Sequence, residues 1–211
     1  PILMAKCSHD LDLITWFMSG IAPVRVASFG SLGYFKPENA PEGSGTRCLV
    51  DCRIERECPY SAYNNYIEKG LWRAYAWESI EHYGESLTEE MKIESLKKDN
   101  PFGRCVWHCD NNVVDRQTVI IEFENGVVAT HTLSTPASKP CRTVQIIGTK
   151  GEIEGNINDS VLVVRKPDLK QEYTEQVVDL NVSMDGHGGG DIGLTEDFVR
   201  VISGEQPSIS S

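Results

Sequence analysis

One segment of the sequence, residues 118–134, constrains the fold more than any other, because it predicts two β-strands and the turn between them. It reads TVIIEFENGVVATHTLS, with β-branched runs on either side of Asn125 and Gly126. An Asn-Gly pair between two such runs is a strong signal for a tight hairpin, since both residues tolerate positive φ. We therefore expect an antiparallel pair of strands at this point of the chain.

The remaining periodic segments predict the fold class. Further strands are expected at residues 23–34, 142–148, 152–156, 161–165 and 173–180. Helical patterns occupy residues 8–19, with Ser8 as the expected N-cap, and residues 59–70, 87–98 and 194–202. Residues 36–58, rich in Pro, Gly and Cys, are expected to form an ordered loop. Helices followed by a meander of strands indicate an α+β fold with a largely antiparallel sheet.

Composition narrows the class of protein and of partner. The chain has 211 residues, which fits one large domain or two small ones and is enough to bury a core, and we expect a single domain over residues 1–211. Its formal net charge of −11 argues against binding to a nucleic-acid backbone, which requires a basic face. No apolar run approaches the roughly 20 residues that span a bilayer, and the first residues lack the layout of a secretory signal. We expect a soluble, cytoplasmic protein that binds neither nucleic acid nor membrane.

The first candidate site lies at the start of the predicted helix over residues 8–19. His9 and Asp12 are three residues apart and project from nearly the same face, and Lys6 precedes them closely. A lysine, an imidazole and a carboxylate at one helix start suit proton transfer or the binding of a polyol. The alternative is a pair of surface charges on an ordinary helix, which spacing alone favours.

The second candidate site is a group of cysteines in the predicted loop. Cys48, Cys52 and Cys58 could supply three ligands of a tetrahedral zinc ion, with Cys105, His108 or Cys109 as the fourth, of which we take Cys109 as the candidate. The spacing lacks the tight pairs of zinc ribbons. The alternative is a set of buried thiols that pack as small apolar groups. The chain has seven cysteines, an odd number that argues against a disulfide framework.

A third candidate is the glycine-rich stretch over residues 186–191, GHGGGD. It lacks the glycine order and the trailing Lys-Ser/Thr of nucleotide-binding loops. It could bring His187 and Asp191 to a substrate, or it could be a plain connection that leads into the last helix. We assign no role to His82, expected on the surface, or to His131, expected on a strand.

Several of these stretches together resemble one family. The stretches are KCSHDLDLITWFMSG (6–20), SFGSLGYFKPENAPEGSGTRC (28–48), CPYSA (58–62), GRCVWHCDNNVVDRQ (103–117), FENGV (123–127), GTKGEI (148–153) and GHGGGD (186–191). They are similar, in order and over almost the whole chain, to the Gfo/Idh/MocA family of NAD(P)-dependent sugar and polyol oxidoreductases.

The resemblance implies an architecture. Members have an N-terminal Rossmann domain and a C-terminal α+β domain with a large, open, mostly antiparallel sheet. Helices cover one face of that sheet, and the other face commonly packs against a partner subunit. We therefore expect this chain to be the C-terminal domain only, excised from a longer two-domain protein, to form a homo-oligomer through the sheet, and to be inactive alone. NAD or NADP would be bound mainly by the missing domain.

The resemblance also implies roles for residues. His9 corresponds to the family's proton-transferring histidine and Asp12 to the aspartate that follows it, while Lys6 would hold the reacting oxygen of a sugar or polyol. Many members carry an aspartate four residues before the histidine, where this chain has Ala5. His187 and Asp191 would lie on the substrate side. The alternative function is a cysteine-rich module, holding structural zinc and without redox activity.

Overall fold

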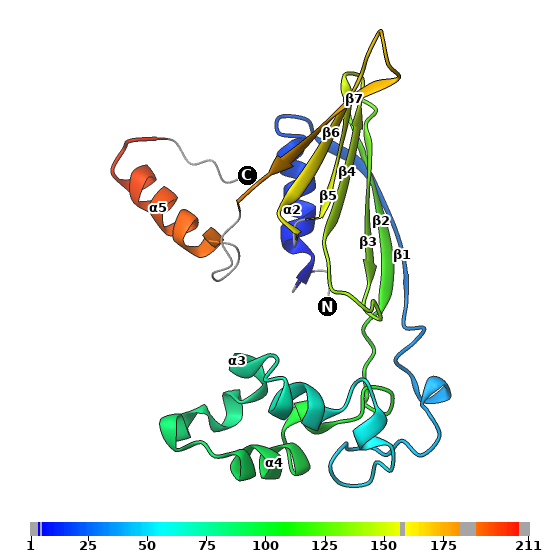
Figure 1. The fold of residues 1–211 in the computed structure, drawn as a ribbon, viewed down its shortest axis with the longest axis vertical. Helices are drawn as coiled ribbons and strands as arrows, with labels where there is room; N and C mark the ends of the chain where they lie inside the picture. The colour runs from blue at the N-terminus through cyan, green and yellow to red at the C-terminus, as the bar shows by residue number, and fades with distance from the viewer. Residues whose placement is uncertain (1–3, 5, 157–158, 182–188, 207–211) are drawn as a thin grey trace. The chain divides into compact units, whose positions relative to one another are not determined.

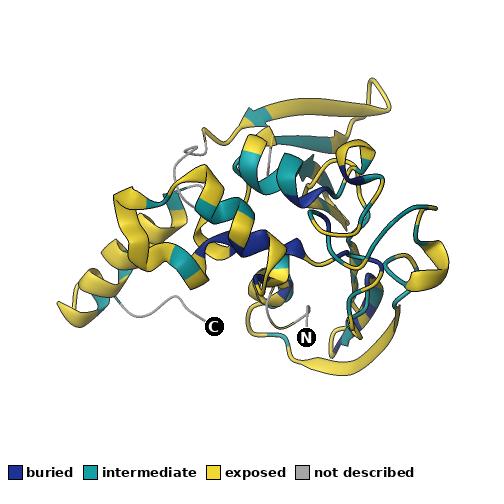
Figure 2. Cartoon of the chain, turned by 90° about the horizontal axis from the view of Figure 1, so that it is seen from below, coloured by how far each residue is buried: buried dark blue, intermediate teal, exposed yellow. Residues whose placement is uncertain are grey.

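The computed structural model describes residues 4, 6–156, 159–181 and 189–206 of the chain. The chain divides into two compact units, Pro1–Pro136 and Ala137–Ser211, and each is described by itself below. Most of the ribbon is exposed or intermediate in burial, and the buried stretches are short (Figure 2). No helix among the described residues is long and apolar enough to cross a membrane.

The first unit contains a three-stranded antiparallel sheet with the order β1-β2-β3 (Figure 1). Its strands are β1 (Pro23–Ser31), β2 (Arg116–Phe123) and β3 (Val128–Ser134). Gly126 has φ of 83° in the turn between β2 and β3, a conformation that glycine adopts without strain. The predicted hairpin is therefore confirmed.

Helix α2 (Ser8–Phe17) covers one face of this sheet. Its side chains Leu11 and Ile14 pack against Val119, Ile121 and Phe123 of β2, which are at most 6% exposed. Burying a side chain of this size stabilises the fold by about 1.5–3 kcal/mol. The alternation of apolar residues along β2 thus selects the face that meets the helix, and this packing fixes the orientation of α2.

The start of α2 differs from the prediction. The helix begins at Ser8, so the N-cap position belongs to Cys7, and no side chain caps it. Ser8 is the first residue of the helix and therefore lies one position past the N-cap, where a serine side chain would cap.

The rest of the first unit is a helical group with its own core. It contains a π-helix, η3 (Tyr63–Glu68), then α3 (Arg73–Ala76), the 3₁₀ segment η4 (Glu78–Ser86) and α4 (Glu89–Lys97). Short 3₁₀ turns are η1 (Pro37–Asn39), η2 (Glu55–Glu57) and η5 (Pro101–Gly103). The buried core is formed by Cys48, Ala62, Ala76, Trp77 and Leu96. Residues 36–58 carry only two of the short turns, as the composition predicted.

The predicted helix over residues 59–70 is present only as the π-helix. The backbone N–H of Lys69 donates to the carbonyl of Asn64, five residues earlier, at 3.0 Å. A π-helix is rarer than an α-helix and is found where packing requires a wider turn. By contrast, the predicted helix over residues 87–98 is confirmed as α4, whose N-terminus is capped by the side chain of Thr88.

The second unit contains a four-stranded antiparallel meander with the order β4-β5-β6-β7. Its strands are β4 (Thr143–Gly148), β5 (Gly151–Asn156), β6 (Val161–Pro167) and β7 (Tyr173–Asp179). Arg165 ties three strands together, since its guanidinium donates to Glu154 at 2.9 Å, Glu175 at 2.7 Å and Glu152 at 3.2 Å. Helix α5 (Gly190–Ile202) follows and begins earlier than the apolar pattern predicted.

The α+β class and the antiparallel pairing of all strands are therefore as predicted. Hydrogen bonds divide the seven strands between two sheets, one in each unit.

Candidate functional site

The start of α2 presents a group of polar side chains away from the sheet. His9 and Asp12 are exposed, whereas Cys7 and Leu11 face the strands. At about 100° per residue, His9 lies about 200° around the helix axis from Cys7, and Asp12 lies close to the direction of His9. The helix therefore places His9 and Asp12 on one face, as their spacing predicted, and this face is open to solvent.

Lys6, which precedes α2 by two residues, contacts two aromatic rings. Its ammonium nitrogen lies 5.5 Å from the ring centroid of Trp72 and 5.4 Å from that of Tyr75. The two rings lie 6.0 Å apart and are more than half exposed, at 56% and 57%. A cation at this distance is attracted to the negative faces of the rings. The structure thus places an exposed aromatic pair beside the predicted catalytic lysine.

Trp72 has an unusual backbone as well as an exposed ring. Its φ is 56° and its ψ is 32°, in the left-handed region. This conformation costs a bulky residue on the order of 1–3 kcal/mol, and such strain clusters at ligand sites. The sequence did not reveal the aromatic pair, because Lys6 and Trp72 are far apart along the chain. An exposed, strained tryptophan next to a lysine is the structural signal that identifies it.

The glycine-rich stretch is only partly described. His187 lies outside the described residues, and Asp191 lies in the first turn of α5, exposed. Gly189 has φ of 81° at the N-cap of this helix. The substrate-side roles of His187 and Asp191 stay predictions.

Three of the four cysteines predicted to bind zinc line one small cavity. Cys48, Cys52 and Cys58 share it with Cys105, whereas Cys109 is not among the lining residues. Burial raises the pKa of Cys48 to about 11, and the neighbouring thiols of Cys105, Cys52 and Cys58 add to the effect. The uncharged thiol is thus the stable form at neutral pH. Zinc in this loop stays a prediction.

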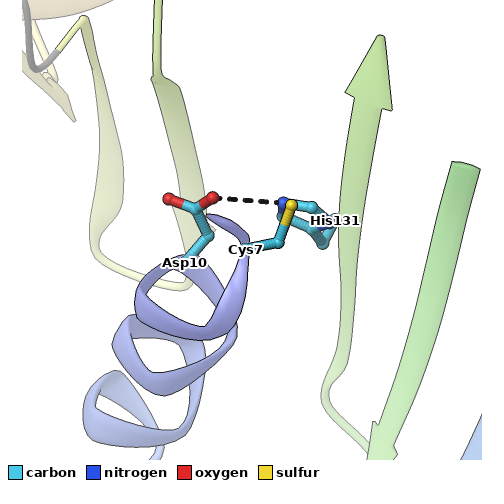
Figure 3. Close-up of side chains that lie close together, drawn as sticks. All are labelled: Cys7, Asp10 and His131. Carbon is cyan, nitrogen blue, oxygen red and sulfur yellow. Dashed lines mark ion pairs between the residues drawn. The ribbon is translucent and has the colours of Figure 1, made fainter. Parts of the chain in front are cut away.

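A different cluster meets the geometric requirement for a metal site. Cys7, Asp10 and His131 have ligand atoms that all lie within 4.8 Å of one another, and this is the one such group of three that the described residues contain. Figure 3 shows the sulfur and the carboxylate converging on the imidazole. None of these three residues is among the sequence-predicted site residues. Two signals could have revealed them, since Cys7 and Asp10 share the sheet-facing side of the helix and His131 shares the inward face of β3 with Ala129 and Leu133.

Comparisons with known proteins agree with the fold. The family model described as "Oxidoreductase family, C-terminal alpha/beta domain" matches residues 1–211. A protein of Bacillus subtilis (strain 168) named "Putative oxidoreductase YteT" is 25% identical over 204 residues, which cover 92% of this chain and 45% of that protein. The chain thus spans less than half the length of this relative. These matches do not favour the alternative of a zinc-holding interaction module. The chain therefore belongs to the Gfo/Idh/MocA oxidoreductase family, of which it represents the C-terminal α/β domain.

Proposed function

We propose that this chain is the substrate-binding domain of an NAD(P)-dependent oxidoreductase that acts on a sugar or a polyol. In this proposal the complete protein is cytoplasmic and carries a second, dinucleotide-binding domain, and the 211-residue domain alone has no turnover. Two findings support it, the family match over the whole chain and the coverage of 45% of the relative from Bacillus subtilis.

The residues of this chain fit the substrate side of such a reaction. All strand pairs among the described residues are antiparallel, so this part of the chain contains no βαβ crossover of the kind that holds a dinucleotide. When bound, the nicotinamide supplies the hydride chemistry. The exposed imidazole of His9 takes the proton from the substrate hydroxyl during oxidation and returns it during reduction. The ammonium of Lys6 holds the same oxygen, and Asp12 accepts hydrogen bonds from neighbouring hydroxyls.

The observation that carries the sugar or polyol assignment is the position of Lys6 over the aromatic pair. The carbon skeleton of a sugar has an apolar C–H surface that packs against an aromatic face, while its hydroxyls require charged or polar partners. Trp72 and Tyr75 offer the first kind of contact, and Lys6 and the exposed His9 offer the second. Both kinds of group thus occur around the start of α2, as a polyhydroxylated substrate requires.

We further propose that the domain forms a homo-oligomer through the sheet face opposite α2. Phe29, Ile120 and Val128 lie on this face and are 76%, 38% and 60% exposed. Apolar side chains of this kind on a β-sheet are typical of surfaces that another protein chain covers.

The experiment that tests the proposed reaction is His9→Asn in the full-length protein. With NAD or NADP and a panel of sugars and polyols, turnover should fall by roughly 10²–10⁴, because a general acid–base contributes about this factor. His82→Asn is the matched control, since His82 is also exposed and has no proposed role. Unchanged turnover in His9→Asn would refute the assignment.

A further inference from the structure

The cluster of Cys7, Asp10 and His131 draws its residues from two elements that pack together. Cys7 is the N-cap residue of α2, and Asp10 lies in its first turn. His131 is paired with the buried Val119 across β2 and β3, so its side chain lies on the face that the helix covers. Cys7 is 2% exposed, and the side chains of His131 and Asp10 are 11% and 24% exposed. The cluster is thus mostly shielded from solvent, with access from the side of Asp10.

The imidazole of His131 is poorly satisfied by protein groups. Its Nδ1 atom is buried and has no hydrogen-bond partner among the described residues. Its Nε2 atom lies 3.5 Å from Oδ2 of Asp10, beyond the usual range of about 2.7–3.2 Å for a hydrogen bond. A buried polar atom without a partner is destabilising, and this cost falls on Nδ1. Nε2, which Asp10 approaches without a normal hydrogen bond, is the nitrogen that a metal ion would bind.

The spacing of the donor atoms suits a tetrahedral ion. With bonds of about 2.0–2.2 Å from zinc to nitrogen and oxygen, two such ligands lie about 3.3–3.5 Å apart. The observed separation of 3.5 Å between Nε2 of His131 and Oδ2 of Asp10 agrees with this distance between two ligands. A sulfur at about 2.3 Å from the ion lies about 3.6 Å from the nitrogen. Sγ of Cys7 lies within 4.8 Å of the other ligand atoms, so it has to move by about 1.2 Å at most.

The donor types select the kind of ion. Magnesium and calcium prefer oxygen ligands alone, whereas a thiolate, an imidazole and a carboxylate together favour zinc and similar transition metals. We propose that Cys7, Asp10 and His131 bind one divalent transition-metal ion of the zinc class. As the ion binds, the thiol of Cys7 releases its proton to solvent, and the thiolate and carboxylate together balance the 2+ charge. Water fills the fourth position.

The position of the site indicates what the ion does. Cys7 and Asp10 face the sheet, while His9 and Asp12 project from the opposite side of the same helical turn. The proposed ion therefore lies on the sheet side of the helix. It connects the start of α2 to β3 and holds the helical turn that carries His9 in place, so Cys7, Asp10 and His131 are positioning residues.

Cobalt titration of the full-length protein tests the site. The protein is stripped of metal with a chelator, kept reduced, and titrated with Co²⁺, whose bond to a thiolate gives a charge-transfer band in the near ultraviolet. We expect one Co²⁺ per chain and displacement by Zn²⁺. Cys7→Ser should remove the band, and His131→Gln should weaken Zn²⁺ binding at least about 10-fold, the smallest loss seen even for outer partners of a ligand. Cys52→Ser makes the same change in the cysteine-lined cavity and should leave the charge-transfer band and the Zn²⁺ affinity unchanged.

Melting curves keep the test valid if Cys7→Ser folds poorly. Zn²⁺ should raise the melting temperature of the wild-type protein but not that of Asp10→Asn, which keeps the size of the side chain. The proposal is overturned if the wild-type protein takes up no metal, or if Cys7→Ser and His131→Gln bind it as tightly as the wild type. Loss of the band in Cys52→Ser alone would place the ion in the other cavity and also overturn it. None of these readouts depends on turnover, so they are independent of the proposed reaction.

Discussion

Gly33 donates its backbone N–H to both carboxylate oxygens of Asp115, at 3.0 and 3.1 Å. The N–H groups of Tyr34 and Phe35 donate to the same carboxylate. Burial of Asp115 acts to raise the pKa of its carboxyl, but the three N–H donors favour the charged form more strongly, and the pKa lies below its ordinary value. One carboxylate thus holds the segment after β1 against the start of β2.

We expect Asp115→Asn to lower the free energy of unfolding by at least about 2 kcal/mol, because an amide leaves buried N–H donors without an acceptor. Urea denaturation measures this change. Asp110→Asn is the control, since the side chain of Asp110 is 89% exposed in its ion pair with Arg104. An equal loss of stability in both variants would contradict the role of Asp115.

The contribution of Asp115 should depend on pH in a defined direction. Its folded-state pKa is lowered, so its stabilising effect is fully present above the unfolded pKa of about 3.9 and is lost as the pH falls through the folded-state value. The difference in stability between wild type and Asp115→Asn should therefore shrink below about pH 4. If the stability difference between wild type and Asp115→Asn grew on acidification, it would contradict this prediction.

The buried thiol of Cys48 should react slowly with alkylating reagents. Because burial raises its pKa to about 11, its thiolate fraction at pH 8 is roughly 100-fold or more below that of an ordinary cysteine of pKa about 8.5. Labelling with iodoacetamide, followed by mass spectrometry of the peptides, should modify the exposed Cys141 first and Cys48 among the last. Equal rates for the two cysteines in the folded protein would show that Cys48 is not buried.

Replacing Trp72 should weaken substrate binding without unfolding the domain. We expect Trp72→Gly in the full-length protein to raise KM about 3–10-fold, the equivalent of one stacking contact. Its melting temperature should fall little, because glycine relieves the strain of φ 56°. Trp72→Phe keeps an aromatic ring and should restore most of the affinity. If both variants leave KM unchanged, the aromatic pair does not contact the substrate.

A charge on the outer sheet face should disrupt self-association. Phe29 is 76% exposed on the face away from α2, and we expect Phe29→Lys to convert the oligomer to monomers in analytical ultracentrifugation. Leu169→Lys serves as the control, since Leu169 is fully exposed in the turn after β6. A wild-type protein that is monomeric at high concentration would refute the proposed oligomer.

The elements that sequence predicted well are those that local patterns determine. The hairpin follows from Asn125-Gly126, and α2 follows from the spacing of Leu11 and Ile14, because each pattern needs only a few neighbouring residues. The π-helix over Tyr63–Glu68 was not predicted, since its residues also suit an α-helix and the wider turn depends on packing.

The candidate site was predicted only in its local part. His9 and Asp12 share a face of one helix, which the spacing alone reveals. The contact of Lys6 with Trp72 joins segments that are distant in sequence, and so does the approach of Cys7 to His131. No periodic pattern encodes such contacts, because they depend on how α2 and its neighbours pack in three dimensions.

The proposed metal site and the proposed substrate site draw on different residues. In these proposals Cys7 and Asp10 anchor the start of α2 to the sheet, while Trp72 and Tyr75, which lie outside α2, contact the substrate beside Lys6. A protein engineer who wants a new substrate should therefore randomise the aromatic pair and leave the anchored side of the helix intact. One who wants a more heat-resistant protein should vary the residues around Cys7 and Asp10 and keep the aromatic pair. The two sets of substitutions do not overlap, so their effects should combine in one protein.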